Sequence, residues 1–170
     1  ALMARQCGGS IRRTLVGGAS ALVPAVANQN PQRAELVALL LDAGADPNLQ
    51  DEDGFTPLMH AASSRSDDAS GIVRALLARG ADPVTRSNKG VTALMMAASS
   101  LADDSPTQQR TALDIVTALH EAGADVAVAD DDGETALDRA RAPKVRSELE
   151  RLWFKATGVR KSACADELMR

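Results

Sequence analysis

The chain has 170 residues and a mass of 17.7 kDa, the size of one ordinary domain or of a short repeat array. Hydrophobic residues make up 45% and charged residues 25%, which excludes a chain that is disordered throughout. Aromatic residues make up only 2%, so the core must be built from aliphatic side chains and Met. That composition suits closely packed helices better than a β-sandwich.

The formal net charge of −4 is unevenly distributed along the chain. Residues 1–138 hold 10 Lys/Arg and 19 Asp/Glu, a net −9, whereas residues 139–170 hold 9 and 4, a net +5. Because the acidic residues 1–138 would repel the phosphates of a nucleic acid, we expect no nucleic-acid partner. No apolar run reaches the roughly 18 residues of a transmembrane helix, so we expect no membrane insertion. Cys7 and Cys164 fit neither a disulfide framework nor a zinc pattern, which favours a reducing compartment. Because no signal peptide or transmembrane segment is visible in this sequence, we expect a cytoplasmic location.

Residues 1–17 precede the clearest repeats. Ala1-Leu-Met-Ala-Arg5 is similar to Ala75-Leu-Leu-Ala-Arg79, which has the pattern of a helix end. We therefore expect residues 1–17 to be either the end of an earlier repeat or an N-terminal capping helix.

Two sequence blocks then recur in a constant order. Gly-Phe-Thr-Pro-Leu-Met-His-Ala-Ala at 54–62 matches the segments at 90–98 and 133–141, and a degenerate copy at 18–26 precedes them. A Gly-Ala-Asp block stands at 44–46, 80–82 and 123–125. The spacings between the glycines that open the first block are 36, 36 and 43 residues. Such a period predicts an array over 18–153, with units at about 18–53, 54–89, 90–132 and 133–153.

Each unit is predicted to contain two helices and a projecting loop. The N-caps of the first helices are hydroxyl residues whose oxygens accept backbone amides, namely Ser20, Thr56, Thr92 and Thr135. Pro57 suits the first helical position. An apolar stripe, such as residues 72–77, indicates the second helix, which ends at Gly44, Gly80 or Gly123. The polar residues that follow predict a hairpin loop.

The extra residues of the long units fall between the two helices. Ser105-Pro106-Thr107-Gln108 reads as a capping box, which predicts a helix from about Pro106 to Ala122. Asn30-Pro31 indicates a similar start in the first unit. We expect residues 99–105 to project opposite the hairpin tips, as a second contact site or as a tolerated loop.

Pro143 is predicted to open a capping helix at the C-terminal end. Val145, Leu149, Leu152 and Trp153 lie on the side of that helix that would face the stack. Residues 154–170 are expected to be a tail or a short helix.

The recurring blocks resemble the ankyrin repeat, with its Gly-x-Thr-Pro-Leu-His-x-Ala-Ala and Gly-Ala-Asp motifs, over residues 18–153. The resemblance implies an all-α solenoid of stacked helix-turn-helix units with projecting β-hairpin loops. It also implies binding of proteins through the hairpin tips and the inner helices. The usual His of the motif is replaced in every unit, by Val23, Met59, Met95 and Asp138. The polar network around it must therefore be absent or rebuilt, and we expect Met59 and Met95 to fill the core.

No residue pattern indicates catalysis or a cofactor. The acidic runs at 51–53 and 130–132, with Glu134, lack the alternating ligands of a calcium loop and are read as hairpin turns. His60 and His120 fall in different units, without further zinc ligands at the usual spacing. His120 is expected to have a structural role. For His60 and Phe55, contact with a partner and packing within the chain are both open alternatives. We predict neither metal nor cofactor, and no enzyme.

The predicted function is a protein-interaction scaffold that binds a partner through its concave face and hairpin tips. The alternative is a regulatory ankyrin segment of a larger multidomain enzyme, channel or effector protein. The acidic, basic and acidic tips suggest a partner with basic residues that flank an apolar anchor. The candidate contacts are Gln50, Glu52, Asp53, Phe55, His60, Ser63, Ser64, Arg86, Asn88, Lys89, Val91, Met96, Ser99, Ser100, Asp131, Asp132, Glu134 and Arg139.

Overall fold

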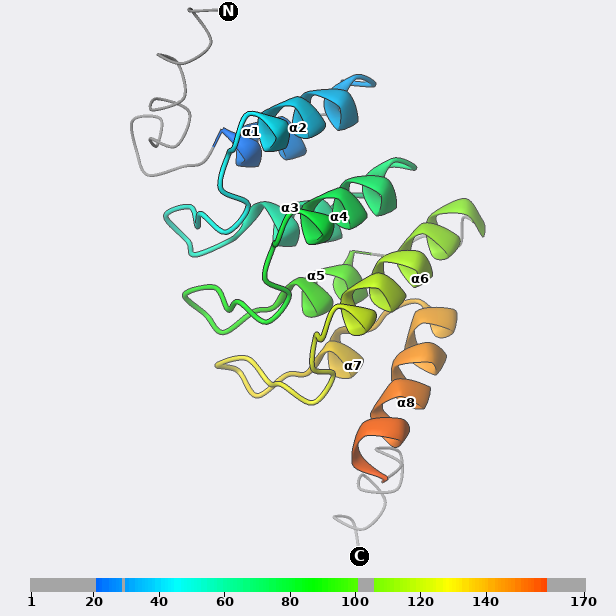
Figure 1. The fold of residues 1–170 in the computed structure, drawn as a ribbon. Helices are drawn as coiled ribbons and strands as arrows, with labels where there is room; N and C mark the ends of the chain where they lie inside the picture. The colour runs from blue at the N-terminus through cyan, green and yellow to red at the C-terminus, as the bar shows by residue number, and fades with distance from the viewer. Residues whose placement is uncertain (1–20, 29, 101–105, 159–170) are drawn as a thin grey trace, which may run out of the picture.

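The computed structural model describes residues 21–28, 30–100 and 106–158. These residues form four helix pairs that stack in one row (Figure 1). The inner helices are α1 (Leu22–Ala27), α3 (Pro57–Ser63), α5 (Ala93–Ser99) and α7 (Ala136–Arg139). The outer helices are α2 (Arg33–Asp42), α4 (Ala69–Ala78), α6 (Pro106–Glu121) and α8 (Pro143–Thr157).

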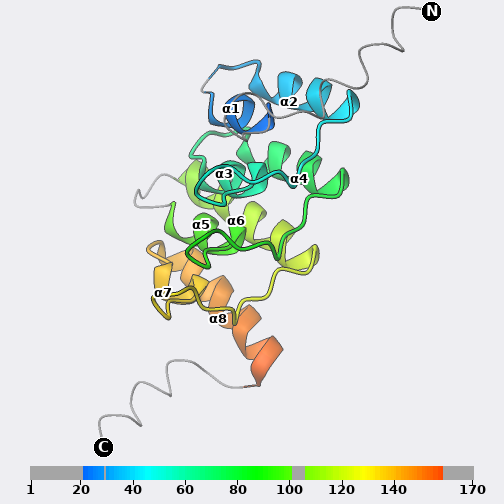
Figure 2. The ribbon, with the colours of Figure 1, turned by 90° about the vertical axis from the view of Figure 1, so that its left-hand side faces the viewer.

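The two layers of helices pack in register along the row. Each inner helix contacts the next inner helix, and each outer helix contacts the next outer helix. The long loops between consecutive pairs all project to the same side, as Figures 1 and 2 show from two directions. The all-α stack of helical pairs with projecting hairpin loops is therefore confirmed.

Threonine side chains begin the inner helices, as the sequence predicted. The Oγ1 atom of Thr56 accepts the amide of Met59 at 3.3 Å, and Thr92 accepts that of Met95 at 3.4 Å. Thr135 accepts the amide of Asp138, whose carboxylate accepts the Thr135 amide in return at 2.9 Å. Ser20 lies outside the described residues.

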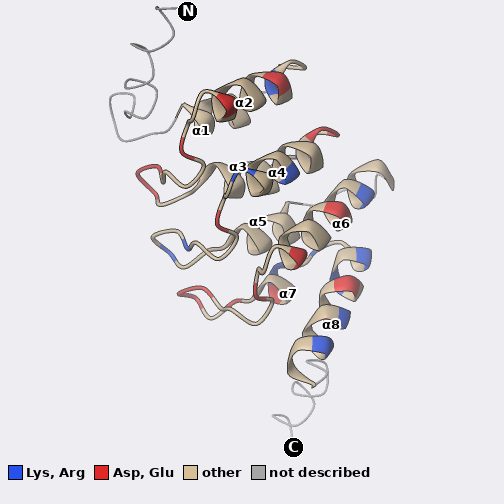
Figure 3. Ribbon diagram, in the orientation of Figure 1, with Lys and Arg blue, Asp and Glu red and all other residues tan. Residues whose placement is uncertain are grey.

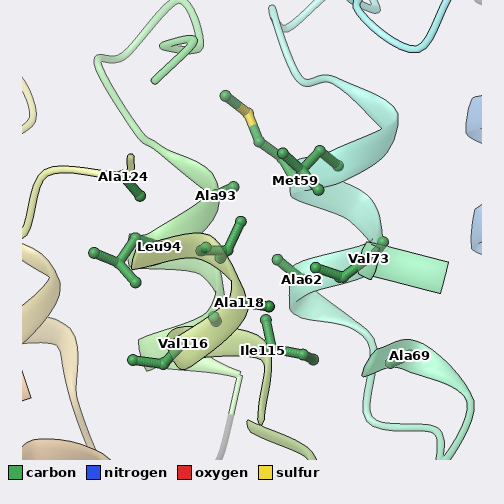
Figure 4. Packing of buried hydrophobic residues seen from close by; sticks show 14 of the residues in the cluster. Met59, Ala62, Ala69, Val73, Ala93, Leu94, Ile115, Val116, Ala118 and Ala124 are labelled. Atoms are coloured by element: carbon green, nitrogen blue, oxygen red, sulfur yellow. The ribbon is translucent and has the colours of Figure 1, made fainter. Parts of the chain in front are cut away.

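Small residues on the inner helices let neighbouring units approach closely. The paired alanines of the repeat motif in α3 and α5 are fully buried, as are the leucines that precede them. Met59 and Met95 are 1% exposed, which confirms that they fill the core where the family motif has His. The side chains in Figure 4, from α3, α4, α5 and α6 and the adjoining loops, belong to one continuous cluster. The described units therefore share one core.

Glycines end the outer helices in the predicted way. Gly44, Gly80 and Gly123 have φ of 85°, 85° and 105°, the left-handed conformation of a helix C-terminus. The surplus residues lie between the helices of a pair, as expected, for example at 64–68 between α3 and α4.

The long outer helix α6 begins at Pro106 and ends at Glu121, one residue before the predicted end. Ser105 and the rest of 101–105 lie outside the described residues. In the first unit α2 begins at Arg33, two residues after Pro31, because Asn30 Oδ1 accepts the Gln32 amide at 2.9 Å and holds a turn there.

Helix α8 closes the row on the side of α6 and α7. Val145, Leu149 and Leu152 are buried, and Trp153 is half-buried against the core. The helix continues to Thr157, where Gly158 ends it with φ of 73°. Residues 1–20 and 159–170, with both cysteines, lie outside the described residues.

Candidate functional site

The three loop tips share one hydrogen-bonded conformation. In the first tip, the Asp51 amide donates to the Phe55 carbonyl at 2.9 Å, and Asp51 Oδ1 accepts the amides of Asp53 at 3.1 Å and Phe55 at 2.8 Å. Ser87 and Asp130 make the equivalent bonds in the second and third tips. The acidic runs are therefore turns in which the first side chain binds its own backbone.

Neighbouring tips are joined by a ladder of hydrogen bonds. The Asn88 amide donates to the Asp53 carbonyl at 3.0 Å, and the Asp131 amide donates to the Lys89 carbonyl at 3.1 Å. These two bonds are equivalent, so each tip repeats the contact of the one before it.

Side chains from the candidate set strengthen this ladder. Gln50 Nε2 donates to the Arg86 carbonyl at 2.9 Å, and the Arg86 guanidinium donates to the Ala129 carbonyl at 2.9 Å. Asn88 Nδ2 donates to the Glu52 carbonyl at 2.9 Å. The tips also approach so closely that a Cβ atom on Gly54 would lie 2.6 Å from the Asn88 nitrogen, which explains the glycine there. Three predicted contact residues therefore also hold the tips together.

The first and third tips are each bonded to the inner helix that follows them in the chain. His60 Nε2 lies 2.8 Å from Asp51 Oδ2, and the Arg139 guanidinium donates to Asp130. Arg139 Nε also lies 3.3 Å from Glu134 Oε2. These pairs hold the first tip against α3 and the third tip against α7.

Hydrogen bonding shifts the titration of both tip carboxylates. Burial raises the pKa of Asp51, but the bonds from His60 and the Phe55 amide outweigh burial and hold the pKa below the ordinary 3.8. Burial also raises the pKa of Asp130. The amides of its turn and Arg139 outweigh burial, so the pKa of Asp130 lies below the ordinary value. Both residues are therefore ionised near neutral pH and keep their partners.

Phe55 lies half-buried at the base of the first tip. Its ring meets the His60 ring edge to face, with the ring centroids 5.8 Å apart and the planes at 63°. Phe55 also packs against the core, so internal packing accounts for part of its surface.

A family model for ankyrin repeats, in three copies, matches residues 22–130. The chain belongs to the ankyrin-repeat family. No curated protein matches the chain. Ankyrin repeats are generally protein–protein interaction modules, so the tips and the inner helices of this ankyrin array are the surfaces to assess for binding.

The charges on the ankyrin tips alternate along the stack. Figure 3 shows acidic residues on the first and third tips and basic residues on the second. The exposed charged residues of the tips are Glu52, Asp53, Arg86, Lys89, Asp131, Asp132 and Glu134. Arg86 and Asp131 lie 3.9 Å apart, which joins the second tip to the third electrostatically. A partner therefore meets an acidic, a basic and an acidic strip in turn.

Two recesses open beside the inner helices. One of about 350 Å³ is lined by His60, Ser63 and Ser64 together with Val26, Ala27, Arg33 and Arg65. Another of about 450 Å³ is lined by Ser99, Arg139 and Arg141 together with Glu134, Asp138, Ala140 and Arg146. The partly buried Met96 lies on α5, between the inner helices that supply His60 and Arg139. The structure thus brings most inner-helix candidates to one face.

The serine candidates already have partners inside the chain. Ser63 and Ser99 donate to carbonyls of their own helices, those of His60 and Met96. Ser100 donates to the Ala97 carbonyl. These hydroxyls are half-buried at the ends of α3 and α5, so they line the face without projecting from it.

Val91 differs from the other candidates because it is only 7% exposed. It follows the glycine of the second tip and belongs to the core cluster, so it supports the tip from below. We leave Val91 out of the proposed binding surface.

The Arg33 side chain makes several hydrogen bonds and an ion pair that the sequence analysis did not predict. It is buried, and its guanidinium lies 2.6 Å from Asp68 Oδ1 and 3.0 Å from Ser64 Oγ. It also donates to the Val26 carbonyl at 3.2 Å. Burial raises the pKa of Asp68, but Arg33 and Ser66 lower it to below the ordinary value. Arg33 thereby joins the first ankyrin unit to the second.

The described part of the chain gathers no three His, Cys, Asp or Glu side chains into a potential metal site. His120 lies in the last turn of the outer helix α6, far along the sequence from His60. Among the described helices, none has both the length and the apolar character that a bilayer crossing requires.

Proposed function

We propose that this ankyrin array is a non-catalytic protein-interaction module that binds its partner across the hairpin tips and the inner-helix face. The observation that supports this most is the ladder that joins three tips of alternating charge into one surface beside two open recesses. A surface that is already ordered loses little conformational entropy when it binds.

The charge pattern defines the chemistry of the partner. Glu52 and Asp53 on the first tip, and Asp131 and Asp132 on the third, suit basic residues on the partner. Lys89 on the middle tip suits an acidic residue between them. Phe55 and Met96 offer a small apolar centre for an aliphatic or aromatic anchor. We also propose that this binding takes place in the cytoplasm.

Selection of a displayed peptide library on the full chain tests the proposal. We expect the selected peptides to contain basic residues around an apolar anchor. The double variant Phe55→Ala/Asp131→Lys should then weaken their affinity at least about tenfold, which is roughly 1.4 kcal/mol.

The matched control is Asp114→Lys, which makes the same charge change on the exposed surface of the outer helix α6. We expect it to leave the affinity unchanged. If the tip variant binds as well as the wild type, or if only the α6 variant loses affinity, the surface assignment is wrong. Far-UV circular dichroism of each variant verifies that the fold is retained.

A further inference from the structure

The recess beside α7 is lined by three arginines that lie close together in the chain. Arg139 ends α7, Arg141 lies in the connection that follows, and Arg146 lies near the start of α8. Ala140 and Ala142 have extended backbone conformations and are buried, so the Arg141 side chain between them is exposed. The connection from α7 to α8 therefore turns its basic side chain toward solvent.

The chain neutralises only one of these three arginines. The Arg139 guanidinium is bonded to Asp130, and its Nε lies 3.3 Å from Glu134 Oε2. Arg141 makes no hydrogen bond or ion pair with the described residues. Arg146 donates only to a backbone carbonyl, at 3.0 Å. Two guanidinium groups of the recess therefore have no carboxylate partner in the described part of the chain.

The acidic side chains that line this recess are bonded elsewhere. Asp138 Oδ2 accepts the amide of Thr135 at 2.9 Å and its hydroxyl at 2.6 Å, as part of the helix cap. Glu134 forms its ion pair with Arg139. Residues 139–146 contain four Lys or Arg and no Asp or Glu. The recess therefore offers cationic donors to an acidic group that the described residues do not supply.

The recess at the first two units shows the opposite arrangement. Its buried arginine, Arg33, lies 2.6 Å from Asp68 Oδ1 and is thus paired within the chain. Arg65, which lines the same recess, donates through Nε to the Ser100 carbonyl at 2.9 Å. The chain uses these arginines to join its own units. The contrast favours an external ligand for Arg141 and Arg146.

The chemistry of the second recess suits a carboxylate. A guanidinium group binds a carboxylate through two parallel N–H···O bonds. The Nε and one terminal nitrogen of Arg146 lie 3.3 Å and 3.0 Å from the Ala140 carbonyl, which orients the group and leaves its other N–H donors unused. Such orientation lowers the entropy cost of binding. The recess has a volume of about 450 Å³, which is within the range of small ligand sites.

We propose that this recess binds an acidic side chain, Asp or Glu, of the protein partner that lies on the hairpin tips. The inference rests on the proposed function and adds the charge of one further part of the partner. Glu134 belongs to the third tip and also lines the recess, so the two surfaces are continuous. Basic residues of a bound segment then lie against the acidic third tip, and its acidic residue meets Arg141 and Arg146.

NMR titration of the full chain with an acetylated and amidated Gly-Glu-Glu-Gly peptide tests the inference without a known partner. We expect saturable shifts of the side-chain Nε–H signals of Arg141 and Arg146, and none with the Gly-Gln-Gln-Gly peptide. No shift at either arginine, or equal binding of the two peptides, overturns the inference.

Two variants assign the binding to the arginines. Arg141→Gln changes a residue without described contacts, so it should keep the fold and weaken binding of the Glu-Glu peptide at least about threefold. Arg141→Gln/Arg146→Gln should weaken it at least about tenfold. The matched control, Arg74→Gln/Arg110→Gln, removes the same charge from exposed positions of α4 and α6 and should bind as the wild type does. Equal losses in the two double variants would indicate non-specific attraction and overturn the inference.

The source of the acidic group is tested with inorganic phosphate. Tighter binding of phosphate than of the Glu-Glu peptide would identify a site for a free anion and overturn the assignment to a protein side chain. Failure of the proposed function gives a different result. In that case Phe55→Ala/Asp131→Lys leaves the affinity of selected peptides unchanged, while the shifts of Arg141 and Arg146 persist and support the recess.

Discussion

The first and third tips are stabilised differently from the middle tip. Asp51 and Asp130 are each bonded to a cationic or titratable residue on an inner helix, His60 and Arg139. The middle tip has Ser87 and Met96 at the corresponding positions. The middle tip has a described neighbour on both sides, whereas each outer tip has one on a single side. Side-chain pairs with an inner helix thus stabilise the two tips that the ladder supports least.

The largest effect is expected when one member of the third pair is removed. Arg139→Met leaves the Asp130 carboxylate, whose side chain is 1% exposed, without its cation. We expect a loss of about 3 kcal/mol in the free energy of unfolding, measured by urea denaturation at pH 7. Asp130→Ser/Arg139→Met copies the middle tip and should lie within about 1 kcal/mol of the wild type. Equal losses in the single and double variants would show that the unpaired Asp130 carboxylate is not the cause of the loss.

The reverse exchange in the middle tip is expected to have a smaller effect. Ser87→Asp buries a carboxylate opposite Met96 and should cost about 2 kcal/mol. Addition of Met96→Arg supplies the cation and should restore at least half of the loss. Met96→Arg alone is the control, and it should cost little because Met96 is partly exposed. No recovery in the double variant would contradict the equivalence of the three tips.

The first pair is more exposed than the third and should contribute less. His60 and Asp51 side chains are 28% and 19% exposed, so water screens their interaction. We expect His60→Met to lower the free energy of unfolding by about 1 kcal/mol. Ser63→Ala, one turn further along α3, should change it by much less. A larger loss for His60→Met than for Arg139→Met would reverse the proposed order.

The same pairs predict a dependence of stability on pH. The pKa values of Asp51 and Asp130 are lowered in the folded chain, so the unfolded chain binds more protons. Their stabilising contribution is complete above the ordinary value of 3.8 and is lost as the pH falls through the lower folded pKa values. The stability of the wild type relative to Asp130→Ser/Arg139→Met should therefore fall below about pH 4, because only the wild type carries the Asp130 carboxylate. A constant difference between pH 7 and pH 3 would exclude this explanation.

The repeated blocks were sufficient to predict the helix pairs, the threonine caps, the glycine ends and the buried Met59 and Met95. These features depend on neighbours close in sequence, where capping and periodicity operate. The bonds from Gln50 to the Arg86 carbonyl and from Arg86 to the Ala129 carbonyl join residues 36 and 43 positions apart. They depend on the stacking distance, which no local pattern specifies.

One signal for the tip pairs was present in the sequence. Asp51 and Asp130 each precede a His or Arg by nine residues, whereas Ser87 precedes a Met by the same interval. Comparison of these positions across the units links the loop residue to the inner-helix residue. The recurrence of an acidic residue nine positions before a His or Arg would have indicated an internal contact as well as a binding role.

The most direct test of the binding surface is a hydrogen-exchange footprint of the full chain with a selected peptide bound. The account predicts slower exchange of the amides at 51–55, 87–91 and 130–134 and around His60, Met96 and Arg139. The outer helices α2, α4 and α6 should exchange as in the free chain. Protection confined to those outer helices, with unchanged tips, would contradict the account.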